Sequence, residues 1–271
     1  MEDNDSPRSN AYGVSRKRKR EAHESNAASS SEGKSNPDSS GHTSVPKNSR
    51  LRKGMVIFKG FLSREEQQEI AAHVHRLGAH RSGGFYHCSN EKTKRMRMMN
   101  LGLRTDGGRH TLDIPREWTD IAVRACRQAA AIDPSIPILR PDVCVVNHYD
   151  STSRLGWHQD LFSSRDPGLP VVSLSLGEAA LFQYRVSWKK SAAVMSVVLE
   201  SGDALIFGGR SRGIIHGVPA IGSRLVSAKP ASDPAENQAS ASREVTGQDE
   251  VGRDLSFMPQ GGRYNLNLRE L

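Results

Sequence analysis

The chain has 271 residues, of which 36% are hydrophobic and 6% aromatic, a low content for a chain folded entirely around a core. Lys and Arg number 38 against 30 Asp and Glu, and the net charge of +8 favours a polyanionic partner. The three cysteines include no C-x-x-C pair, which excludes a disulfide-stapled secreted domain as the expected class. No apolar run reaches the roughly 18–20 residues that a membrane-spanning helix needs. We therefore expect a soluble, intracellular protein without a membrane partner.

Two long polar stretches are predicted to be disordered. Residues 1–52 are rich in Ser, Asn, Lys and Arg and contain scarcely any large apolar residue. An unbroken basic run, Arg16–Arg20, lies within this tail, where it is a nuclear-import signal, a nucleic-acid tether or a solvated charge run. We expect the folded domain to cover residues 53–271. Residues from about 223 to 262 lack apolar periodicity and predict a disordered insertion within that domain.

Two helices are predicted in the first half of the domain. Ser63 and Glu66 have the spacing of a capping box, and the apolar residues that follow have helical spacing, which predicts a helix over about 64–77. Pro115 at a first-turn position, followed by apolar residues on one face, predicts a second helix that continues to about Ala131.

Short β-rich runs separated by Gly, Pro, Ser and Asp begin at Val143. Two helices followed by eight short strands predict a mainly β fold, a sandwich or barrel with helical buttresses. The predicted strands are Val143–Tyr149, Leu155–His158, Val171–Leu176, Ala180–Tyr184, Val194–Leu199, Ala204–Phe207, Ile214–Val218 and Tyr264–Leu268.

Three side chains suggest a metal site. His158 and Asp160 are two residues apart, so on an extended strand both leave the same face. His216 lies in an apolar strand farther along the chain, where the alternative is a core histidine bonded to a backbone carbonyl. Two histidines and one carboxylate leave one side of a metal open, as in the facial triad of non-haem Fe(II) oxygenases. Zinc in a hydrolytic site would use the same ligand types.

The last predicted strand alternates polar and apolar residues. Arg263, Asn265, Asn267 and Arg269 share one face of it. Two arginines on a face with amides are costly inside a barrel unless they meet anions, and the planar guanidinium matches carboxylates. This pattern favours a dicarboxylate cosubstrate. The alternative is an edge strand whose arginines lie in solvent.

Five short blocks follow one another along the second half of the chain: Asn147–Tyr149, His158–Asp160, Ser173–Gly177, the Gly202–Asp203 to His216–Gly217 segment, and Arg263–Arg269. In this order they resemble the AlkB-type Fe(II)- and 2-oxoglutarate-dependent dioxygenases. The resemblance covers about Val143 to Leu271 without the insertion. It implies a double-stranded β-helix, or jelly-roll, with N-terminal helical buttresses and a nucleotide-recognition lid before the barrel.

The resemblance also implies the roles of the site residues. Iron would be held by His158, Asp160 and His216, which form the catalytic centre and leave room for 2-oxoglutarate and O₂. Arg263, with Asn147 and Tyr149, would meet the distal carboxylate of 2-oxoglutarate. Arg269 would lie near the metal-bound end. The implied cosubstrate pocket comprises Asn147, Tyr149, Leu155, Ser173, Arg263, Asn265 and Arg269.

The activity implied is oxidative demethylation of N-methylated bases in DNA or RNA. Hydroxylation of an N-methyl group gives a hemiaminal that releases formaldehyde, while 2-oxoglutarate becomes succinate and CO₂. Leu161-Phe162 stands where bacterial members carry a charged pair, so the chain is more similar to the eukaryotic AlkB-homologue-one-like subgroup. N6-methyladenine, 1-methyladenine and 3-methylcytosine are the candidate bases. We expect a monomer in the nucleus and cytoplasm.

The segment 83–99, between the two predicted helices, mixes aromatic residues with cations, which suits a lid that grips phosphates while an aromatic ring stacks on a base. The alternative is that its methionines belong to the core and its aromatic residues only pack. Other classes remain open: a protein or small-molecule hydroxylase, and a non-catalytic nucleic-acid-binding module. The expected nucleic-acid contacts are Phe85, Tyr86, Lys92, Lys94, Arg95 and Arg97.

Overall fold

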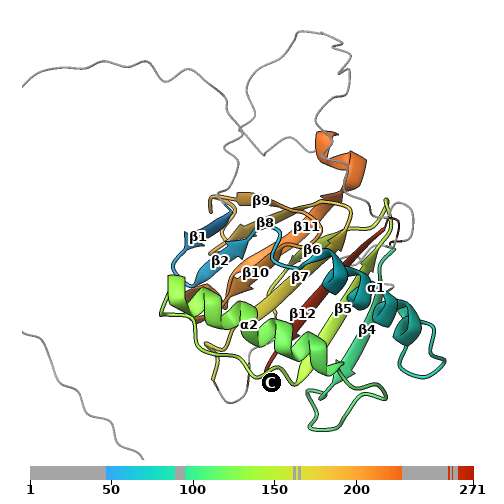
Figure 1. Cartoon of the computed structure of the whole chain (residues 1–271). Helices are drawn as coiled ribbons and strands as arrows, with labels where there is room; N and C mark the ends of the chain where they lie inside the picture. The colour runs from blue at the N-terminus through green and yellow to red at the C-terminus, as the bar shows by residue number, and fades with distance from the viewer. Residues whose placement is uncertain are drawn as a thin grey trace, which may run out of the picture. The chain divides into compact units, whose positions relative to one another are not determined.

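Two antiparallel sheets make up most of the structure, a computed structural model that describes residues 47–88, 95–160, 163, 166–227, 256, 258 and 262–271 (Figure 1). The major sheet has the strand order β1-β2-β10-β7-β12-β5-β4-β3, and the minor sheet has the order β6-β11-β8-β9. The strands are β1 Asn48–Arg52, β2 Met55–Phe58, β3 Tyr86–His87, β4 Arg97–Gly102, β5 Val143–Tyr149, β6 Leu155–His158, β7 Val171–Gly177, β8 Ala180–Arg185, β9 Met195–Leu199, β10 Ala204–Phe207, β11 Ile215–Ile221 and β12 Arg263–Arg269.

The eight strands β5 to β12 divide equally between the two sheets in the manner of a jelly-roll, and only β8 and β9 are consecutive strands of the same sheet. Four of them, β10, β7, β12 and β5, form the centre of the major sheet, and the other four are the whole minor sheet. These are the eight strands that the sequence predicts, and the expected jelly-roll architecture is confirmed. Strands β1 to β4 extend the major sheet at its two edges and were not predicted.

The boundary of the predicted tail at residue 52 is wrong. Asn48–Arg52 pairs with β2 as an edge strand, and an edge strand tolerates the polar residues that suggested disorder. The predicted insertion also begins too early, because Gly222–Ser227 forms a 3₁₀ helix, η2. The basic run Arg16–Arg20 and residues 228–255 lie outside the described residues.

Two α-helices lie against the major sheet (Figure 1). Helix α1 covers Arg64–Gly78, and its predicted capping box is present: Ser63 Oγ accepts from the Glu66 amide and the Glu66 carboxylate accepts from the Ser63 amide. Helix α2 covers Arg116–Ile132, with Pro115 at the N-cap rather than in the first turn. Neither of these described helices is long and apolar enough to cross a membrane.

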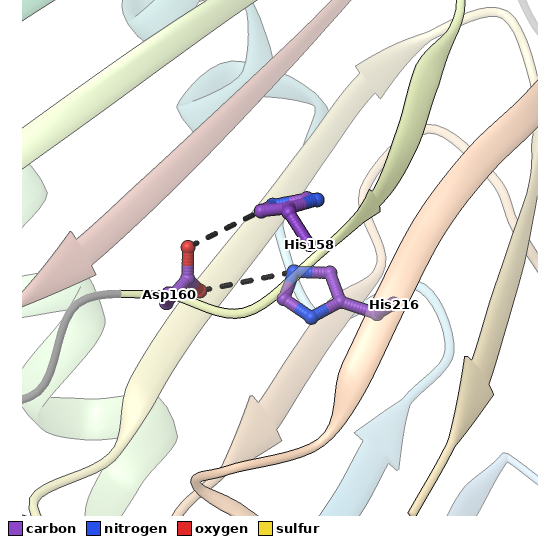
Figure 2. Close-up of side chains that lie close together, drawn as sticks. All are labelled: His158, Asp160 and His216. Atoms are coloured by element: carbon purple, nitrogen blue, oxygen red, sulfur yellow. Dashed lines mark ion pairs between the residues drawn. The ribbon is translucent and has the colours of Figure 1, made fainter. Parts of the chain in front are cut away.

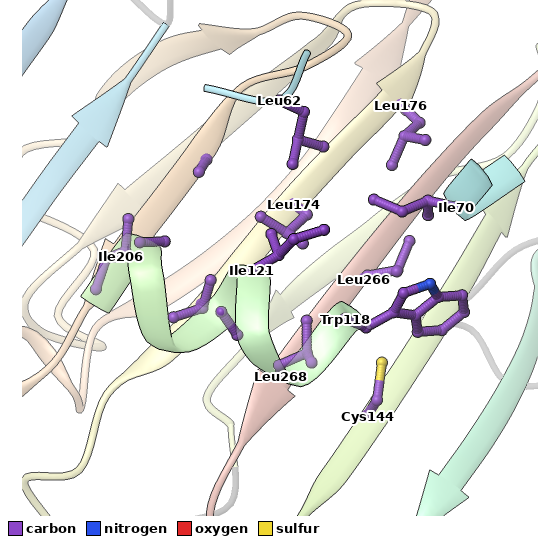
Figure 3. Packing of buried hydrophobic residues seen from close by; sticks show 14 of the residues in the cluster. Leu62, Ile70, Trp118, Ile121, Cys144, Leu174, Leu176, Ile206, Leu266 and Leu268 are labelled. Carbon is purple, nitrogen blue, oxygen red and sulfur yellow. The ribbon is translucent and has the colours of Figure 1, made fainter. Parts of the chain in front are cut away.

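The alternation along β12 divides the interior into two parts. Leu266 and Leu268 pack in a hydrophobic cluster between the major sheet and the helices, together with Trp118 of α2 (Figure 3). A second cluster, which includes Tyr149 and Phe182, fills the space between the two sheets. Because successive side chains of a strand point to opposite faces, the polar side chains of β12 point toward the minor sheet. This is the side on which the candidate site lies.

Candidate metal centre

The pairing of β6 with β11 places two histidines side by side. His158, the last residue of β6, is the direct cross-strand partner of His216 on β11. Asp160 follows the end of β6 by two residues and turns its carboxylate toward both imidazoles (Figure 2). The distances from the Asp160 carboxylate oxygens are 3.9 Å to His158 Nε2 and 3.8 Å to His216 Nε2. The three ligand atoms lie within 4.8 Å of one another, so one metal ion can reach all three.

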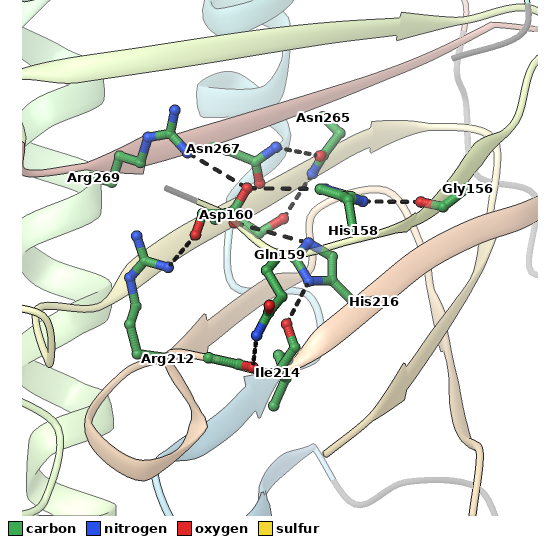
Figure 4. Close-up of polar contacts among 12 residues, drawn as sticks. Gly156, His158, Gln159, Asp160, Arg212, Ile214, His216, Asn265, Asn267 and Arg269 are labelled. Atoms are coloured by element: carbon green, nitrogen blue, oxygen red, sulfur yellow. Dashed lines mark hydrogen bonds and ion pairs between the residues drawn. The ribbon is translucent and has the colours of Figure 1, made fainter. Parts of the chain in front are cut away.

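Backbone carbonyls fix the orientation of both imidazoles (Figure 4). The Nδ1 of His158 lies 2.9 Å from the Gly156 carbonyl oxygen, and the Nδ1 of His216 lies 3.3 Å from the Ile214 carbonyl oxygen. A carbonyl only accepts, so Nδ1 carries the proton in each ring and Nε2 keeps its lone pair for a metal. His216 therefore has the backbone partner of a core histidine and still presents a free ligand atom.

Burial and charge suit this group of side chains to a cation. Burial raises the pKa of Asp160, but the neighbouring His216, Arg269, His158 and Arg212 together lower it by more, so the carboxyl pKa lies below its ordinary value. Burial also lowers the pKa of His216 to about 4, although Asp160 acts in the opposite direction. At neutral pH the site thus offers a carboxylate and a neutral imidazole, the states that bind metals.

Two arginines hold Asp160 from different sides (Figure 4). Arg269 Nη1 lies 3.4 Å from the Asp160 carboxylate, which confirms that Arg269 is close to the metal end of the site. The buried Arg212 donates from Nη1 to the Asp160 carbonyl oxygen at 3.5 Å and from Nε to the Leu169 carbonyl oxygen at 2.9 Å. The sequence analysis missed Arg212, because an arginine in a Gly- and Ser-rich loop reads as exposed.

Arg263 is enclosed at the other end of the same face. Its side chain is 1% exposed, and it donates to Ser175 Oγ at 2.8 Å and to the Glu178 carbonyl oxygen at 3.0 Å. Burial lowers its pKa to about 10, so the guanidinium stays charged at neutral pH. Strand β12 is paired on both sides, with β7 and β5, and the edge-strand alternative is therefore wrong.

Several polar atoms on this face lack partners among the described residues. They include Arg263 Nε, Arg269 Nε, the Tyr149 hydroxyl and Asn147 Oδ1. Buried polar groups are normally hydrogen-bonded, so unpaired ones point to a missing ligand. The two guanidiniums match the two carboxylates of 2-oxoglutarate in charge and in hydrogen-bonding type. The chain's own residues thus fit the cosubstrate.

The other residues predicted for the cosubstrate pocket are held in place by contacts within the protein. Asn265 Nδ2 donates to Ser173 Oγ at 2.8 Å and to the Leu174 carbonyl oxygen at 3.1 Å, so its amide is already held within the sheet. Leu155 packs against the cluster that contains Tyr149. Asn265 and Ser173 therefore line the face and fix its geometry, while Arg263 and Tyr149 keep unpaired groups.

The predicted lid is partly a packing element. Phe85 is half-buried against the helix-side cluster and stacks on Tyr264 at 6.1 Å between centroids, while the Arg97 guanidinium lies 5.6 Å from its ring. Arg97 also bonds His148 Nδ1 at 2.7 Å. Both side chains therefore make contacts within the protein while staying partly exposed, and the expected roles of Phe85 in base stacking and of Arg97 in phosphate contact stay predictions.

The remaining lid residues differ in their accessibility. Tyr86 is 47% exposed and accepts a hydrogen bond from Asn100, and Arg95 is exposed, so both stay available to a partner. Met96 and Met99 are fully buried, as the packing alternative expects. The predicted contacts Lys92 and Lys94 lie outside the described residues.

Comparison with known proteins identifies the family. The model of the 2OG-Fe(II) oxygenase superfamily matches residues 54–269, which include the whole metal centre and β12. The chain belongs to the 2OG-Fe(II) oxygenase superfamily. The cofactors are therefore Fe(II), 2-oxoglutarate and O₂, and the zinc alternative for the His₂Asp cluster is wrong.

Similar proteins include AlkB-type enzymes of plants and bacteria. The chain is 37% identical over 198 residues to the DNA N(6)-methyladenine demethylase ALKBH1C of Arabidopsis thaliana, covering 63% of this chain and 43% of that protein. It is 37% identical over 91 residues to the alpha-ketoglutarate-dependent dioxygenase AlkB of Escherichia coli, 34% of this chain and 41% of that protein. The chain thus spans less than half the length of these relatives.

A solved structure of OsALKBH1 superposes on the chain with a TM-score of 0.63 at 32% identity. The match covers 83% of this chain and all of that one. Both the predicted AlkB-type resemblance and its subgroup are confirmed by these relatives.

Proposed function

We propose that the protein is an Fe(II)- and 2-oxoglutarate-dependent oxidative demethylase of N-methylated bases in DNA or RNA, with formaldehyde, succinate and CO₂ as its other products. The observation that carries the proposal is the His158-Asp160-His216 cluster, which lies on the same inter-sheet face as the buried Arg263 and the partly buried Arg269. The printed names of relatives such as ALKBH1C and AlkB support nucleic acid as the substrate class.

Each residue of the site has a distinct task in this proposal. His158, Asp160 and His216 hold the iron through Nε2 and carboxylate atoms, with their orientation set by Gly156 and Ile214. When bound, iron and 2-oxoglutarate supply the oxidising power for hydroxylation of a C–H bond.

Selection of that C–H bond is the task of the protein. A strong oxidant attacks the nearest bond, so the pocket must hold the N-methyl group beside the open side of the triad. Arg263, which is buried and charged, and the unpaired Tyr149 hydroxyl would hold the distal carboxylate of the cosubstrate. A base within a duplex has to be flipped out to reach so enclosed a site.

The identity of the base is the finer part of the proposal. N6-methyladenine is the first candidate, because it is named for the plant relatives, and 1-methyladenine and 3-methylcytosine are the others. Leu161 and Phe162, which distinguish this chain from the bacterial pattern, lie outside the described residues. RNA remains a candidate alongside DNA.

Mass spectrometry of nucleosides tests the activity, the base and the polymer together. The protein is incubated with mixed methylated DNA and RNA, Fe(II) and 2-oxoglutarate, and Asp160→Ala serves as the inactive control. We expect loss of at least one methylated nucleoside, matched by formaldehyde and succinate. Succinate formation dependent on Asp160, with every nucleic acid unchanged and a protein or small molecule hydroxylated instead, would contradict the demethylase proposal.

We further propose that the protein is a monomer that works in the nucleus and cytoplasm, with Arg16–Arg20 as the import signal. A fluorescent fusion in which these five residues are replaced by Gln should shift toward the cytoplasm. An unchanged distribution would mean that the run is a tether or a solvated tail. Sedimentation of the purified full chain tests the monomer.

A further inference from the structure

A group of aromatic and basic side chains, partly exposed, lies on the outer face of the minor sheet, opposite the face that carries the metal centre. His158 and Tyr184 both pair with His216 and point between the sheets. Their sequence neighbours Trp157 and Arg185 point to the opposite face, because side chains alternate along a strand. Strands β6 and β8 flank β11, so Trp157 and Arg185 meet across it.

Three residues of this group form one stack, which we name the ledge: Trp157, Arg185 and Trp188. The Arg185 guanidinium carbon lies 4.7 Å from the centroid of Trp157 and 5.5 Å from that of Trp188. Both distances are in the range of cation–π contact. The indole of Trp188 is nevertheless 53% exposed, so the stack ends in an accessible aromatic ring.

The ledge is joined to the metal centre through Gln159, which lies between two of the metal ligands in the sequence. Trp188 Nε1 donates to Gln159 Oε1 at 3.4 Å, and Gln159 Nε2 donates to the Gly213 carbonyl oxygen at 2.6 Å. These bonds bring the β8–β9 turn against the segment that carries His158 and Asp160. A strand bound at the ledge would therefore lie next to the segment that carries two of the metal ligands.

The segment that carries Arg185 and Trp188 is positively charged. Residues 185–195 contain three cations, Arg185, Lys189 and Lys190, and no acid. Both lysines are exposed, and Arg185 Nε has no hydrogen-bond partner among the described residues. An exposed indole beside unneutralised cations is the combination that binds single-stranded nucleic acids, whose bases stack on aromatic rings while cations follow the backbone.

We propose that the ledge binds a single strand of nucleic acid next to the target nucleotide. A neighbouring base stacks on the exposed face of Trp188, and phosphates meet Arg185, Lys189 and Lys190. This inference rests on the proposed function and adds to it a second contact surface, separate from the lid. Single strands are favoured over duplexes, because the bases of a duplex already stack on one another and leave no face free for Trp188.

Fluorescence anisotropy of a short labelled oligothymidylate tests the ledge. The full chain is used without iron or 2-oxoglutarate, across a range of salt concentrations. Loss of one base–aromatic stack costs about 1–3 kcal/mol, so Trp188→Ala should weaken binding by about 5- to 150-fold at every salt concentration. The Lys189→Gln/Lys190→Gln double variant should instead flatten the dependence on salt, because each phosphate that is no longer neutralised lowers the slope by about 0.7 for a single strand.

Matched variants separate stacking from other effects. Trp188→Phe keeps an aromatic face and should retain most of the affinity. Val198→Ala, at a residue of β9 in the same sheet that is 42% exposed, should bind like wild type. The defect of Trp188→Ala should be larger for the single strand than for a duplex of the same sequence.

Three results would overturn the ledge: wild-type affinity of Trp188→Ala at all salt concentrations, a defect of Trp188→Phe equal to that of Trp188→Ala, or equal defects on duplex and single strand. The proposed function is tested separately by nucleoside mass spectrometry. If the wild type demethylates a nucleoside and Trp188→Ala binds as well as the wild type, the ledge proposal is wrong and the demethylase proposal stands. If Trp188→Ala binds the oligonucleotide more weakly but no methylated nucleoside is consumed by the wild type, the demethylase proposal is wrong and the ledge proposal stands.

Discussion

Gly156 and Ile214 contribute only carbonyl oxygens to the metal centre, but those two atoms decide what the histidines can do. Each accepts from Nδ1 and leaves Nε2 directed at the shared position beside Asp160. The imidazoles do not have to reorient when iron arrives, so little side-chain entropy is lost on binding. Single-residue changes at this site should therefore act on metal binding more than on folding.

Asp160→Ala should abolish 2-oxoglutarate turnover while the protein stays folded, because one of three iron ligands is removed. A ligand that binds only the native state raises its stability, so added Fe(II) under anaerobic conditions should raise the melting temperature of the wild type but not of the variant. Circular dichroism checks the fold. Wild-type turnover by Asp160→Ala would remove this residue from the metal centre.

Arg263→Leu should raise the Michaelis constant for 2-oxoglutarate far more than it disturbs iron binding. Removal of one partner of a buried charge pair costs on the order of 2–5 kcal/mol. Arg263 also donates to Ser175 and Glu178, so the Leu variant should be less stable as well. Arg263→Lys keeps the charge and serves as the comparison. An unchanged Michaelis constant in a folded Leu variant would show that the distal carboxylate binds elsewhere.

The buried imidazole of His148 should make stability fall in mild acid. Burial, assisted by Arg97 and opposed by Asp150, lowers its pKa from 6.5 to about 4. Between these values the unfolded chain binds a proton that the folded chain does not, so the free energy of unfolding decreases as pH falls from 6.5 to about 4. The other titratable groups that face this ring are His75 and Tyr264, and the ring of Phe85 also lies against it.

The measurement is urea unfolding at a series of pH values for the wild type and His148→Gln, which cannot titrate. The wild type should lose more stability than the variant across this interval, and the two should run parallel above pH 6.5. Parallel curves throughout would show that the proton is not excluded from His148 in the folded state.

At the level of elements, local patterns predicted the β5–β12 strands and both helices. Strand β12 alternates polar and apolar residues, and α1 begins with a capping box. A pattern of a few residues is therefore enough to predict each of these elements. Strand β2 was missed because all four of its residues are buried, which removes the alternation. Strand β4 was missed because its arginine and methionines also suit a surface lid.

Two features made part of the site predictable: some of its residues lie close together in the sequence, and others belong to motifs that resemble a known family. The His158-Asp160 spacing is local, His216 was added because it lies in a predicted apolar strand, and the role of Arg263 toward the distal carboxylate was implied by the resemblance. Arg212 and the ledge could not be predicted, because only the register of β6, β11 and β8 brings Trp157 to Arg185. The sequence around Phe85, an aromatic residue next to cations, also did not indicate that this ring packs against Tyr264 and the helix-side cluster.

The capping box of α1 provides a test at the same scale. Ser63→Ala removes the acceptor for the Glu66 amide and should lower the free energy of unfolding by about 1 kcal/mol. Chemical denaturation measures the change. Ser196→Ala, at an exposed residue of β9, is the control, and its effect should stay within about 0.5 kcal/mol. Equal effects of the two substitutions would mean that the cap does not stabilise α1.

At the scale of the whole molecule, the net charge of +8 has to be assigned to particular surfaces. The basic run, the lid and the ledge each carry cations, and all three attract a polyanion. Within the lid, Arg97 is partly buried and bonded to His148, Arg95 is exposed, and Lys92 and Lys94 lie outside the described residues.

Neutralising Lys92, Lys94 and Arg95 together should weaken nucleic-acid binding and lower its salt slope by about 0.7–0.9 for each phosphate that these side chains no longer neutralise. The comparison is made in a chain whose Arg16–Arg20 run is replaced by Gln, so that nonspecific tethering does not hide the effect. Conversion of 2-oxoglutarate to succinate without nucleic acid should persist. Identical salt slopes would identify the segment as a structural flap, and would favour hydroxylation of a protein or small molecule.

The position of β12 affects how the protein folds. This strand lies between β5 and β7, yet in the chain it comes after both and is separated from β11 by residues 222–262. The major sheet therefore stays split until a segment more than a hundred residues distant from β5 closes it, and non-local pairing of this kind is slow. Until then two strands have unpaired edges, so β5 and β7 are the places where a newly made chain is most exposed to aggregation.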